Sequence, residues 1–462
     1  MVVTVMPITV MGVTINMLSE GIMQFYNRET ELKQLNQVFN LTKNTSQMTV
    51  ITGRRRIGKT RLILKAVENK QFLYFFVSRK SESLLCEEYL EEIRKKLKVK
   101  VFGEIHRFKD IFEIVMEQSR DQQIVLIIDE IQEFLRINPS IFSDIQNIWD
   151  RLKNDTHLHL VFCGSIYSMM KRIYENSKEP LFGRADQKIT LQPFNVNILQ
   201  QIYREFNKTI DAKDFLAFYT VTGGVAKYVE YFTDRKIFRF KEMMNEIFQE
   251  NSLFLDEGKS VLIEEFGKEY TTYFSILALI ASSKTSRAEM ESILEQNIGG
   301  HLDRLENHFK VIEKVKPIFS KPAGKVQKYF ISDNFLSFWF RFVYKYYSAL
   351  ELKNFDYLKQ IVFRDFDSYS GRFLEKYFKE KLALSGRFNK IGSYWEKGNR
   401  NEIDIVALNE AEKFVLIAEV KLNKQKASLQ SLQQKSVRLL NYLKDFQLEF
   451  KIFSLEDLFT PI

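Results

Sequence analysis

The sequence predicts an α/β fold in which a parallel sheet is covered by helices on both faces. Short apolar segments typical of buried strands alternate with amphipathic helical segments between residues 48 and 191. Glycine-rich or polar motifs directly follow several of these strands, and ligands of such sheets bind at the carboxyl ends of the strands. A second group of strand signals after residue 400 predicts a separate C-terminal α/β domain.

The length of 462 residues allows two or three domains, and the first is expected at residues 23–194. Helices are expected wherever apolar residues recur at helical spacing: over 25–41, from Lys59 onward, over 87–97 and over 141–153. The strands are expected where short apolar runs occur: at 48–52, 72–77, 124–128, 158–163 and 189–191.

Residues 1–22 are expected to form an N-terminal extension. No charged residue occurs before Glu20, which raises the question of a membrane span. The segment is short for a span, mixes Thr, Pro, Gly and Asn with apolar residues, and lacks the basic start of a signal peptide. We favour Met23 as the natural start of the protein over an anchor, and a strand-like extension is the remaining alternative. We expect no membrane association, and the two cysteines, Cys86 and Cys163, fit a reducing cytoplasm.

Two further regions follow the first domain. Residues 195–267 have a helical pattern with a break at Gly223-Gly224 and are expected to form a helical lid. Residues 268–350 predict a winged helix with three helices and a two-stranded wing. The third helix is expected near 298–308, the strands near 310–315 and 325–331, and an aromatic-rich helix over 332–347.

Residues 351–462 predict the C-terminal α/β domain. A helix is expected from about residue 370, followed by strands at 402–408 and 413–420. A long helix is expected over 425–446.

The most specific motif is GRRRIGKT at residues 53–60, which matches G-x-x-x-x-G-K-T at every fixed position. It follows an apolar strand and opens a helix, which is the context that this motif requires. The glycines let backbone N–H groups surround phosphate oxygens, Lys59 can reach the β- and γ-phosphates, and Thr60 can bind Mg²⁺. We therefore predict a P-loop ATPase that binds ATP with Mg²⁺. The expected nucleotide-binding residues of this segment are Gly53, Arg54, Arg55, Arg56, Ile57, Gly58, Lys59, Thr60 and Arg61.

The next polar motif is Asp129-Glu130, at the end of an apolar strand. Asp129 is the expected partner of the Mg²⁺ ion, and Glu130 is placed to polarise the attacking water as a general base. Ser165 follows another strand and can contact the γ-phosphate or the water, although an ordinary turn serine would have the same pattern.

Together these motifs resemble the archaeal-type ATPase family within the STAND branch of AAA-related nucleoside triphosphatases. The resemblance implies that Arg28 lies near the nucleotide base and that Arg184 is a γ-phosphate sensor; a surface loop arginine is the alternative for Arg184. Ala226 stands where the family pattern has proline, which leaves that nucleotide contact open. The resemblance rests on FYNRETELKQL at 25–35, GRRRIGKT, IIDEIQEFL at 127–135, FCGS at 162–165, LFGR at 181–184 and GGVAKYV at 223–229.

The formal net charge of +9 favours an acidic partner such as nucleic acid, and a lysine-rich surface without such a partner is the alternative. Winged helices place one helix in a DNA groove and the wing on the backbone. The cations Arg304, Lys310, Lys321 and Lys325 can meet phosphates there, but nearby carboxylates dilute their charge. DNA contact and a packing role both stay open for this region, and so does homo-oligomer formation.

The C-terminal domain carries an ordered set of charged residues. Glu375 lies in a predicted helix, Asp404 in a strand, and Glu419 and Lys421 two residues apart at the end of the next strand, so that both point to one face. The set resembles the core of the PD-(D/E)xK nucleases. The resemblance implies that Glu375, Asp404 and Glu419 hold a second Mg²⁺ or Mn²⁺, while Lys421 orients or activates water. A salt-bridged strand surface is the alternative.

These features support three hypotheses for function. The first is an ATP-controlled protein that processes nucleic acid, with DNA favoured, through a metal-dependent nuclease domain. The second is a STAND-type signalling or scaffold ATPase that cuts nothing. The third is an ATP-dependent regulator that binds DNA through its winged helix.

Overall fold

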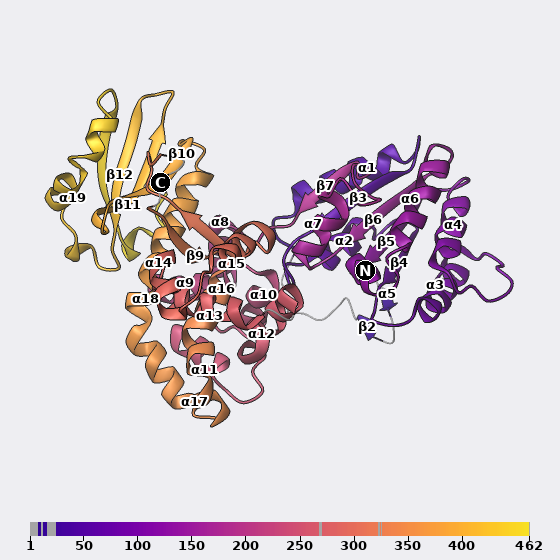
Figure 1. Cartoon of the computed structure of the whole chain (residues 1–462), viewed down its shortest axis with the longest axis horizontal. Helices are drawn as coiled ribbons and strands as arrows, with labels where there is room; N and C mark the ends of the chain where they lie inside the picture. Colours follow the sequence, from indigo (N-terminus) through magenta and orange to yellow (C-terminus); the bar gives the residue numbers. More distant parts are fainter. Residues whose placement is uncertain are drawn as a thin grey trace.

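The computed structural model describes residues 8–10, 13–15, 25–267, 270–321, 324 and 326–461. Figure 1 shows an N-terminal lobe built on a sheet, a helical middle region, and a C-terminal lobe with its own sheet. Of the predicted N-terminal extension, only the strands β1 (Ile8–Val10) and β2 (Val13–Ile15) are described, and they pair as an antiparallel hairpin.

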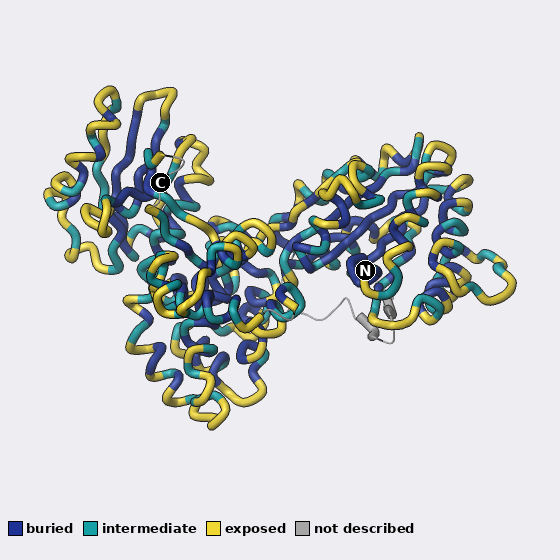
Figure 2. Tube along the Cα trace, in the orientation of Figure 1, coloured by how far each residue is buried: buried dark blue, intermediate teal, exposed yellow. Residues whose placement is uncertain are grey.

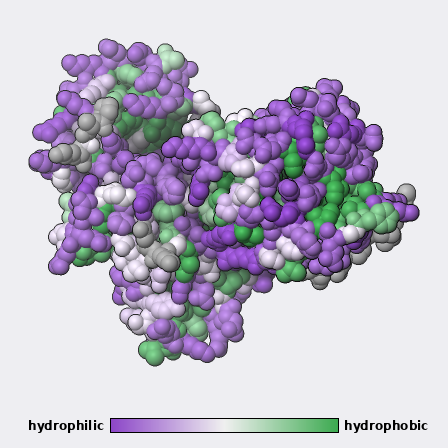
Figure 3. Space-filling view, turned by 45° about the vertical axis from the view of Figure 1, so that its right-hand side comes forward, coloured by the Kyte–Doolittle hydropathy of each residue, from purple (hydrophilic) through white to green (hydrophobic). Residues whose placement is uncertain are grey.

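The surface agrees with an ordinary globular composition. The face of the molecule in Figure 3 is mostly hydrophilic, with smaller apolar areas among the polar side chains. Within the described ranges, no helix is long and apolar enough to cross a membrane.

The N-terminal lobe contains a five-stranded parallel sheet with the strand order β4-β5-β6-β3-β7, which confirms the predicted fold class. All six residues of the interior strand β5 are buried because its side chains alternate between two cores. Figure 2 shows this sheet as a buried layer between helices. The strands are β3 (Gln47–Thr52), β4 (Phe72–Phe76), β5 (Ile124–Asp129), β6 (Leu158–Cys163) and β7 (Gln187–Thr190).

Helices cover both faces of this sheet. One core contains residues of α1 and α2, and the other contains residues of α3, α4, α6 and α7. Three helices of this lobe, α4, α5 and α7, were not predicted from the sequence. The helices are α1 (Glu29–Leu41), α2 (Lys59–Ala66), α3 (Glu82–Leu97), α4 (Phe108–Gln118), α5 (Phe134–Ile137), α6 (Ile141–Leu152) and α7 (Tyr167–Glu175).

The middle region is helical and shares one apolar core with the α1/α2 face of the sheet. Its first part contains the helices α8 (Val196–Phe206), α9 (Ala212–Thr222), α10 (Ala226–Asp234), α11 (Phe240–Ile247) and α12 (Leu253–Phe266). Its second part contains α13 (Tyr270–Ala281), α14 (Arg287–Leu294), α15 (Gly299–Asp303), α16 (Asn334–Phe342) and α17 (Tyr347–Glu351).

The elements expected of a winged helix lie near their predicted positions. A π-helical turn over 304–308 extends α15, and β8 (Ile312–Val315) pairs antiparallel with β9 (Lys328–Ile331). The predicted phosphate contact at Lys325 lies outside the described residues. The assignment of this region as a DNA-binding winged helix stays a prediction.

The C-terminal lobe begins with the 30-residue helix α18 (Phe355–Leu384), which starts well before the predicted position. Its sheet has the order β10-β11-β12-β13, antiparallel in the first two pairs and parallel in the last. The outer strands β10 and β13 were not predicted. The four strands are β10 (Lys390–Glu396), β11 (Arg400–Asn409), β12 (Phe414–Val420) and β13 (Gln447–Phe453).

The predicted long helix over 425–446 is wrong. Only α19 (Leu429–Ser436) is α-helical there, and a 3₁₀ turn follows at Leu439–Tyr442. The apolar spacing that suggested one helix instead packs this broken segment on the sheet, through Leu432, Leu439 and Leu443. The chain must return to the start of β12 because β13 pairs parallel with it, and parallel neighbours require a crossover connection.

Candidate functional sites

The glycine-rich loop lies at the carboxyl end of β3 and leads into α2. Gly58 caps the helix with φ +95°, a left-handed conformation that favours glycine. The Lys59 ammonium is buried inside the loop, where it donates hydrogen bonds to the carbonyl oxygens of Gly53 (2.9 Å) and Arg54 (3.1 Å). The Ile57 side chain is buried in the core, so its backbone is the part available to a ligand. This loop has the geometry of an anion cradle at a helix N-terminus.

Asp129 lies opposite the loop at the end of β5. Its Oδ2 accepts hydrogen bonds from the Thr60 hydroxyl (3.0 Å) and the Tyr74 hydroxyl (2.6 Å), and its Oδ1 accepts one from the backbone N–H of Glu130 (2.9 Å). The paired hydroxyl and carboxylate oxygens of Thr60 and Asp129 are hard donors of the kind that Mg²⁺ prefers, so this pair fits the predicted ion.

Tyr74 was missed by sequence reasoning. It lies in β4, the strand beside β5, within a run of aromatic residues that indicated only a core strand. Burial and the adjacent Asp129 carboxylate raise the pKa of the Tyr74 hydroxyl, so it stays protonated and acts as a donor. The only signal in the sequence was the hydroxyl group of one tyrosine in the segment FLYFF.

Glu130 is held beside the loop in a left-handed backbone conformation, with φ 55°. Its Oε2 accepts a hydrogen bond from the Ser165 hydroxyl (2.9 Å) and another from the Gln132 side-chain amide. The structure therefore brings Ser165, at the end of β6, to the carboxylate that was predicted as a general base. Gln132 was not singled out from the sequence.

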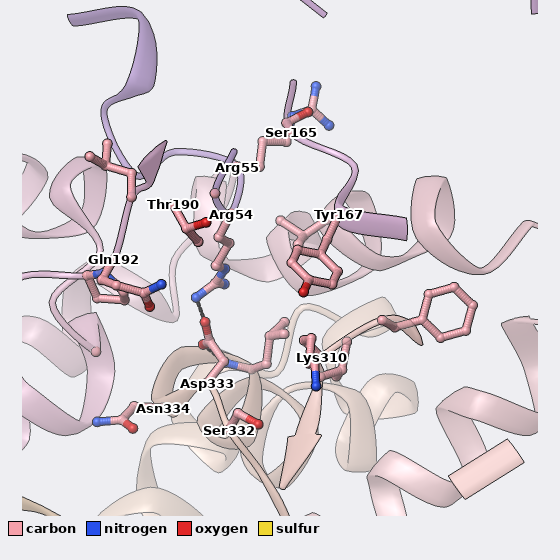
Figure 4. Close-up of a pocket in the computed structure, with 18 of the residues that line it drawn as sticks. Arg54, Arg55, Ser165, Tyr167, Thr190, Gln192, Lys310, Ser332, Asp333 and Asn334 are labelled. Carbon is pink, nitrogen blue, oxygen red and sulfur yellow. Dashed lines mark hydrogen bonds and ion pairs between the residues drawn. The ribbon is translucent and has the colours of Figure 1, made fainter. Parts of the chain in front are cut away.

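Two cavities meet at the loop. The smaller, of about 380 Å³, is lined by Arg55, Arg56 and residues 58–61 of the loop, together with Asp129, Glu130 and Ser165. The other wall of this cavity is formed by a helix that begins inside the GGVAKYV motif, through Ala226, Lys227 and Glu230. The larger, of about 670 Å³, lies between the loop, the segment after β7, and residues of α12, α16 and α18 (Figure 4).

Arg28 and Arg184 were both predicted to contact nucleotide. Arg28 donates to the Gln192 carbonyl at 2.8 Å and its guanidinium lies 5.1 Å from the centre of the Phe194 ring. Arg184 lines neither cavity. Its guanidinium instead pairs with Asp150 at 2.7 Å, so within this chain the structure does not bring Arg184 to the phosphate loop.

The predicted charged set of the C-terminal lobe comes together at one edge of its sheet. The Lys421 ammonium lies 3.0 Å from a Glu419 oxygen and 3.8 Å from an Asp404 oxygen. Asp404 also accepts a hydrogen bond from the Val420 backbone (2.8 Å), and Glu419 one from Lys435 (3.0 Å). Lys421 thus occupies the space between the two carboxylates.

Glu375 of α18 approaches this group from the side. Desolvation by the surrounding protein and then the nearby Asp404 charge raise the pKa of Glu375 to about 7, although its side chain is partly exposed. Burial also raises the pKa of Asp404. For Glu419, burial is outweighed by hydrogen bonds from Lys435 and Lys421, which lower its pKa.

The charged cluster of Asp404, Glu419 and Lys421 has no room for a metal ion while Lys421 lies between the two carboxylates. Across the described part of the chain, no group of three or more His, Cys, Asp or Glu side chains is arranged to hold a metal ion. The residue types at Asp404 and Glu419 suit a hard divalent cation, but the ammonium of Lys421 holds that space.

The five-stranded parallel sheet, the anion-cradling loop and the acidic strand end opposite it define a P-loop ATPase. A family profile described as an ATPase domain predominantly from Archaea matches residues 25–232. An uncharacterized protein of Methanocaldococcus jannaschii is 31% identical over 406 residues, which cover 86% of this chain and 87% of that protein. The chain belongs to this family of archaeal-type ATPases.

Other similarities agree with this assignment. A second profile, of archaeal and bacterial proteins of unknown function, matches residues 339–436. An uncharacterized ATP-binding protein of the same Methanocaldococcus species is 45% identical over 51 residues, which are 11% of this chain and 83% of that protein. A Walker-type ATPase of Pyrococcus abyssi has a similar fold, with a TM-score of 0.53, 16% identity, and coverage of 71% of this chain and 99% of that one.

Proposed function

We propose that this ATPase is an ATP-controlled nucleic-acid-processing protein whose C-terminal lobe cleaves phosphodiester bonds with the help of a divalent metal. The observation that carries the proposal is the meeting of Asp404, Glu419 and Lys421 at one sheet edge. Two carboxylates and a lysine provide the charges that metal-dependent phosphodiester hydrolysis uses.

The nucleotide site uses the loop for the phosphates and the acidic strand end for ion and water. Lys59 neutralises the β- and γ-phosphates, Thr60 and Asp129 provide oxygens for Mg²⁺, and Glu130 takes the proton of the attacking water. The Mg²⁺ ion, when bound, supplies charge neutralisation at the phosphate oxygens. Ser165 orients Glu130 through their 2.9 Å hydrogen bond. Arg28 belongs to the base end of the site.

In the C-terminal lobe, Asp404 and Glu419 would hold a Mg²⁺ or Mn²⁺ ion, with Glu375 as an additional oxygen donor. A bound cation supplies charge stabilisation at the scissile phosphate. Lys421 would then leave the two carboxylates and orient water, since the ion repels its ammonium. Nucleic acid is proposed as the partner because the chain has a formal charge of +9.

The domain roles follow from this scheme. Residues 23–194 form the ATPase core, 195–267 the helical lid, 268–350 a winged helix and 351–462 the nuclease-like domain. The winged helix would contact the nucleic-acid backbone through its wing.

A nuclease assay with Mg²⁺ or Mn²⁺ tests the proposal, on single- and double-stranded DNA and RNA, with and without ATP. We expect wild-type cleavage to be lost in Asp404→Ala and Lys421→Ala while ATP hydrolysis persists. The matched control is Lys424→Ala, an exposed lysine close in sequence to Lys421. Absence of cleavage under every combination of metal, nucleotide and substrate would exclude the nuclease part.

The second candidate function is a STAND-type signalling or scaffold ATPase that cuts nothing. The observation favouring it is the ion pairing of Lys421 with both carboxylates, together with the lack of a three-residue metal group in the described ranges. Under this alternative, Asp404→Ala lowers the stability of the C-terminal lobe, and calorimetry detects the same Mn²⁺ binding to the wild type and to Asp404→Ala.

A further inference from the structure

The phosphate loop carries three consecutive arginines, and each is paired with a carboxylate from the second half of the chain. Arg54 pairs with Asp333, the residue that caps the N-terminus of α16. Arg55 pairs with a Glu264 oxygen at 3.2 Å, and Arg56 with Glu257 at 2.7 Å. Such a run of arginines is not required by the G-x-x-x-x-G-K-T motif, so the pairing is a particular feature of this loop.

Helix α12 provides most of these contacts from one face. Glu257 and Glu264 are seven residues apart, which places them on the same side of the helix two turns apart. Glu264 also pairs with Arg79 at 3.3 Å, and the next residue, Glu265, accepts hydrogen bonds at the start of α7 from the Tyr167 backbone (2.8 Å) and the Ser168 hydroxyl. The helix therefore contacts the carboxyl edge of the sheet through its acidic side chains.

The third contact crosses the larger cavity. In Figure 4, the Arg54 guanidinium points from the loop toward Asp333, which lies on the opposite wall with Ser332 and Asn334. Both side chains of this pair are largely buried, so their charges are shielded little by solvent. This ion pair spans the two halves of the molecule at the point where they meet.

Two of the three arginines face the cavity in which the phosphates are expected, whereas Arg54 lines only the larger cavity beside it. Arg55 and Arg56 line the smaller cavity together with Lys59 and Thr60. Phosphate oxygens and carboxylate oxygens are the two anions that a guanidinium fork binds best. A triphosphate in the loop brings several negative charges next to two arginines that Glu257 and Glu264 already hold, and anions that compete for one guanidinium repel each other.

We propose that Glu257, Glu264 and Asp333 form an acidic latch on the loop arginines, and that the phosphates of ATP release it by taking Arg55 and Arg56 from Glu264 and Glu257. Because the carboxylates of the latch lie on α12 and at the start of α16, these two helices would respond to the binding of phosphate groups. This inference rests on the nucleotide site proposed above. It adds a regulatory role for three residues outside the P-loop motifs, because release of the latch frees the second half of the chain to move.

The test compares the ATP affinity of the wild type with that of Glu257→Gln, Glu264→Gln, Asp333→Asn and the triple variant, using a fluorescent ATP analogue. These changes remove charge and little else. The amide oxygen introduced by Glu257→Gln still accepts the hydrogen bond from the Tyr228 hydroxyl, and asparagine is a good helix cap. The control is Glu250→Gln, which removes a carboxylate paired with Lys353 on the surface.

We expect each latch variant to bind the analogue about threefold to tenfold more tightly, since a latch that must open before binding lowers the apparent affinity. We also expect the triple variant without nucleotide to have the scattering profile that the wild type adopts only with ATP. Unchanged or weaker binding in the variants overturns the latch, because the carboxylates would then be neutral to binding or would orient the arginines for phosphate.

The two proposals fail in different ways. If Lys59→Ala leaves binding of the analogue intact, the nucleotide site itself is wrong. If Lys59→Ala abolishes binding and the latch variants bind as the wild type does, the site stands and only the latch is refuted.

Discussion

Replacing Tyr74 with phenylalanine tests how the ion site of the ATPase is built. The Tyr74 hydroxyl donates a 2.6 Å hydrogen bond to the Asp129 oxygen that also accepts from Thr60. A hydrogen bond to a charged group contributes about 1.5–3 kcal/mol, and partners that orient metal ligands typically change metal affinity by roughly 10- to 100-fold. Two other hydrogen bonds to Asp129 remain in the variant, so we expect about a tenfold loss of Mg²⁺ affinity.

The assay titrates Mg²⁺ against the binding of a fluorescent ATP analogue and, separately, against phosphate release. The matched control is Tyr89→Phe, which removes a 2.9 Å hydrogen bond from another buried tyrosine to the Phe76 carbonyl and none to the Asp129 carboxylate. Both variants are expected to lose similar stability, and only Tyr74→Phe shifts the Mg²⁺ midpoint. An equal Mg²⁺ midpoint for wild type and Tyr74→Phe would refute the assignment of Asp129 as an ion partner that Tyr74 positions.

Three further outcomes are expected. Glu130→Gln keeps ATP binding and slows hydrolysis about 100-fold or more, because the general base is lost; turnover of radioactive ATP measures this. Burial lowers the pKa of His159 from 6.5 to about 3, so the unfolded chain binds more protons between these values. The free energy of unfolding that His159 contributes is therefore fully present above the unfolded pKa, and it falls by about 1.4 kcal/mol per pH unit as the pH drops towards the folded pKa. Urea unfolding at several pH values measures this slope, and His159→Gln is expected to remove it. Gly258→Ala presses a Cβ into the Trp339 ring and costs about 1–3 kcal/mol, whereas Gly371→Ala, with open space around it, costs nothing in thermal unfolding.

The sheet and the phosphate loop were predictable because their signals are local. Four of the five parallel strands contain short apolar runs, β7 has the single apolar residue Ile189, and β3 is followed directly by the loop. Helices α4 and α7 were missed although the buried residues of each recur at helical spacing. In both cases the spacing of the apolar residues was enough to predict the helix.

The C-terminal errors have another cause. The apolar residues between 425 and 446 have a spacing that suits one helix, but pairing of β13 with β12 decides where the helix must end. Strand β13 is exposed at several positions and so carries little apolar pattern. Neither the end of the helix nor strand β13 can be predicted before the partner strand β12 is known, since parallel pairing joins segments that are distant in sequence.

The site residues divide in the same way. Lys59, Thr60 and Asp129 could be found from motif spacing, whereas Tyr74 and Gln132 act through tertiary neighbours. Arg184 shows the limit of transfer by motif, because its partner Asp150 lies on a helix that the motif does not include.

Helix α18 gives the two proposed sites a common element. On one side, the buried ammonium of Lys376 donates to the Ser332 carbonyl (2.6 Å) and the Asn334 side chain (2.7 Å), which flank Asp333, the partner of Arg54. On the other side, the preceding residue, Glu375, approaches Asp404. Under the latch proposed above, the adjacent residues Lys376 and Glu375 are the contacts through which a shift of α16 would reach the C-terminal cluster.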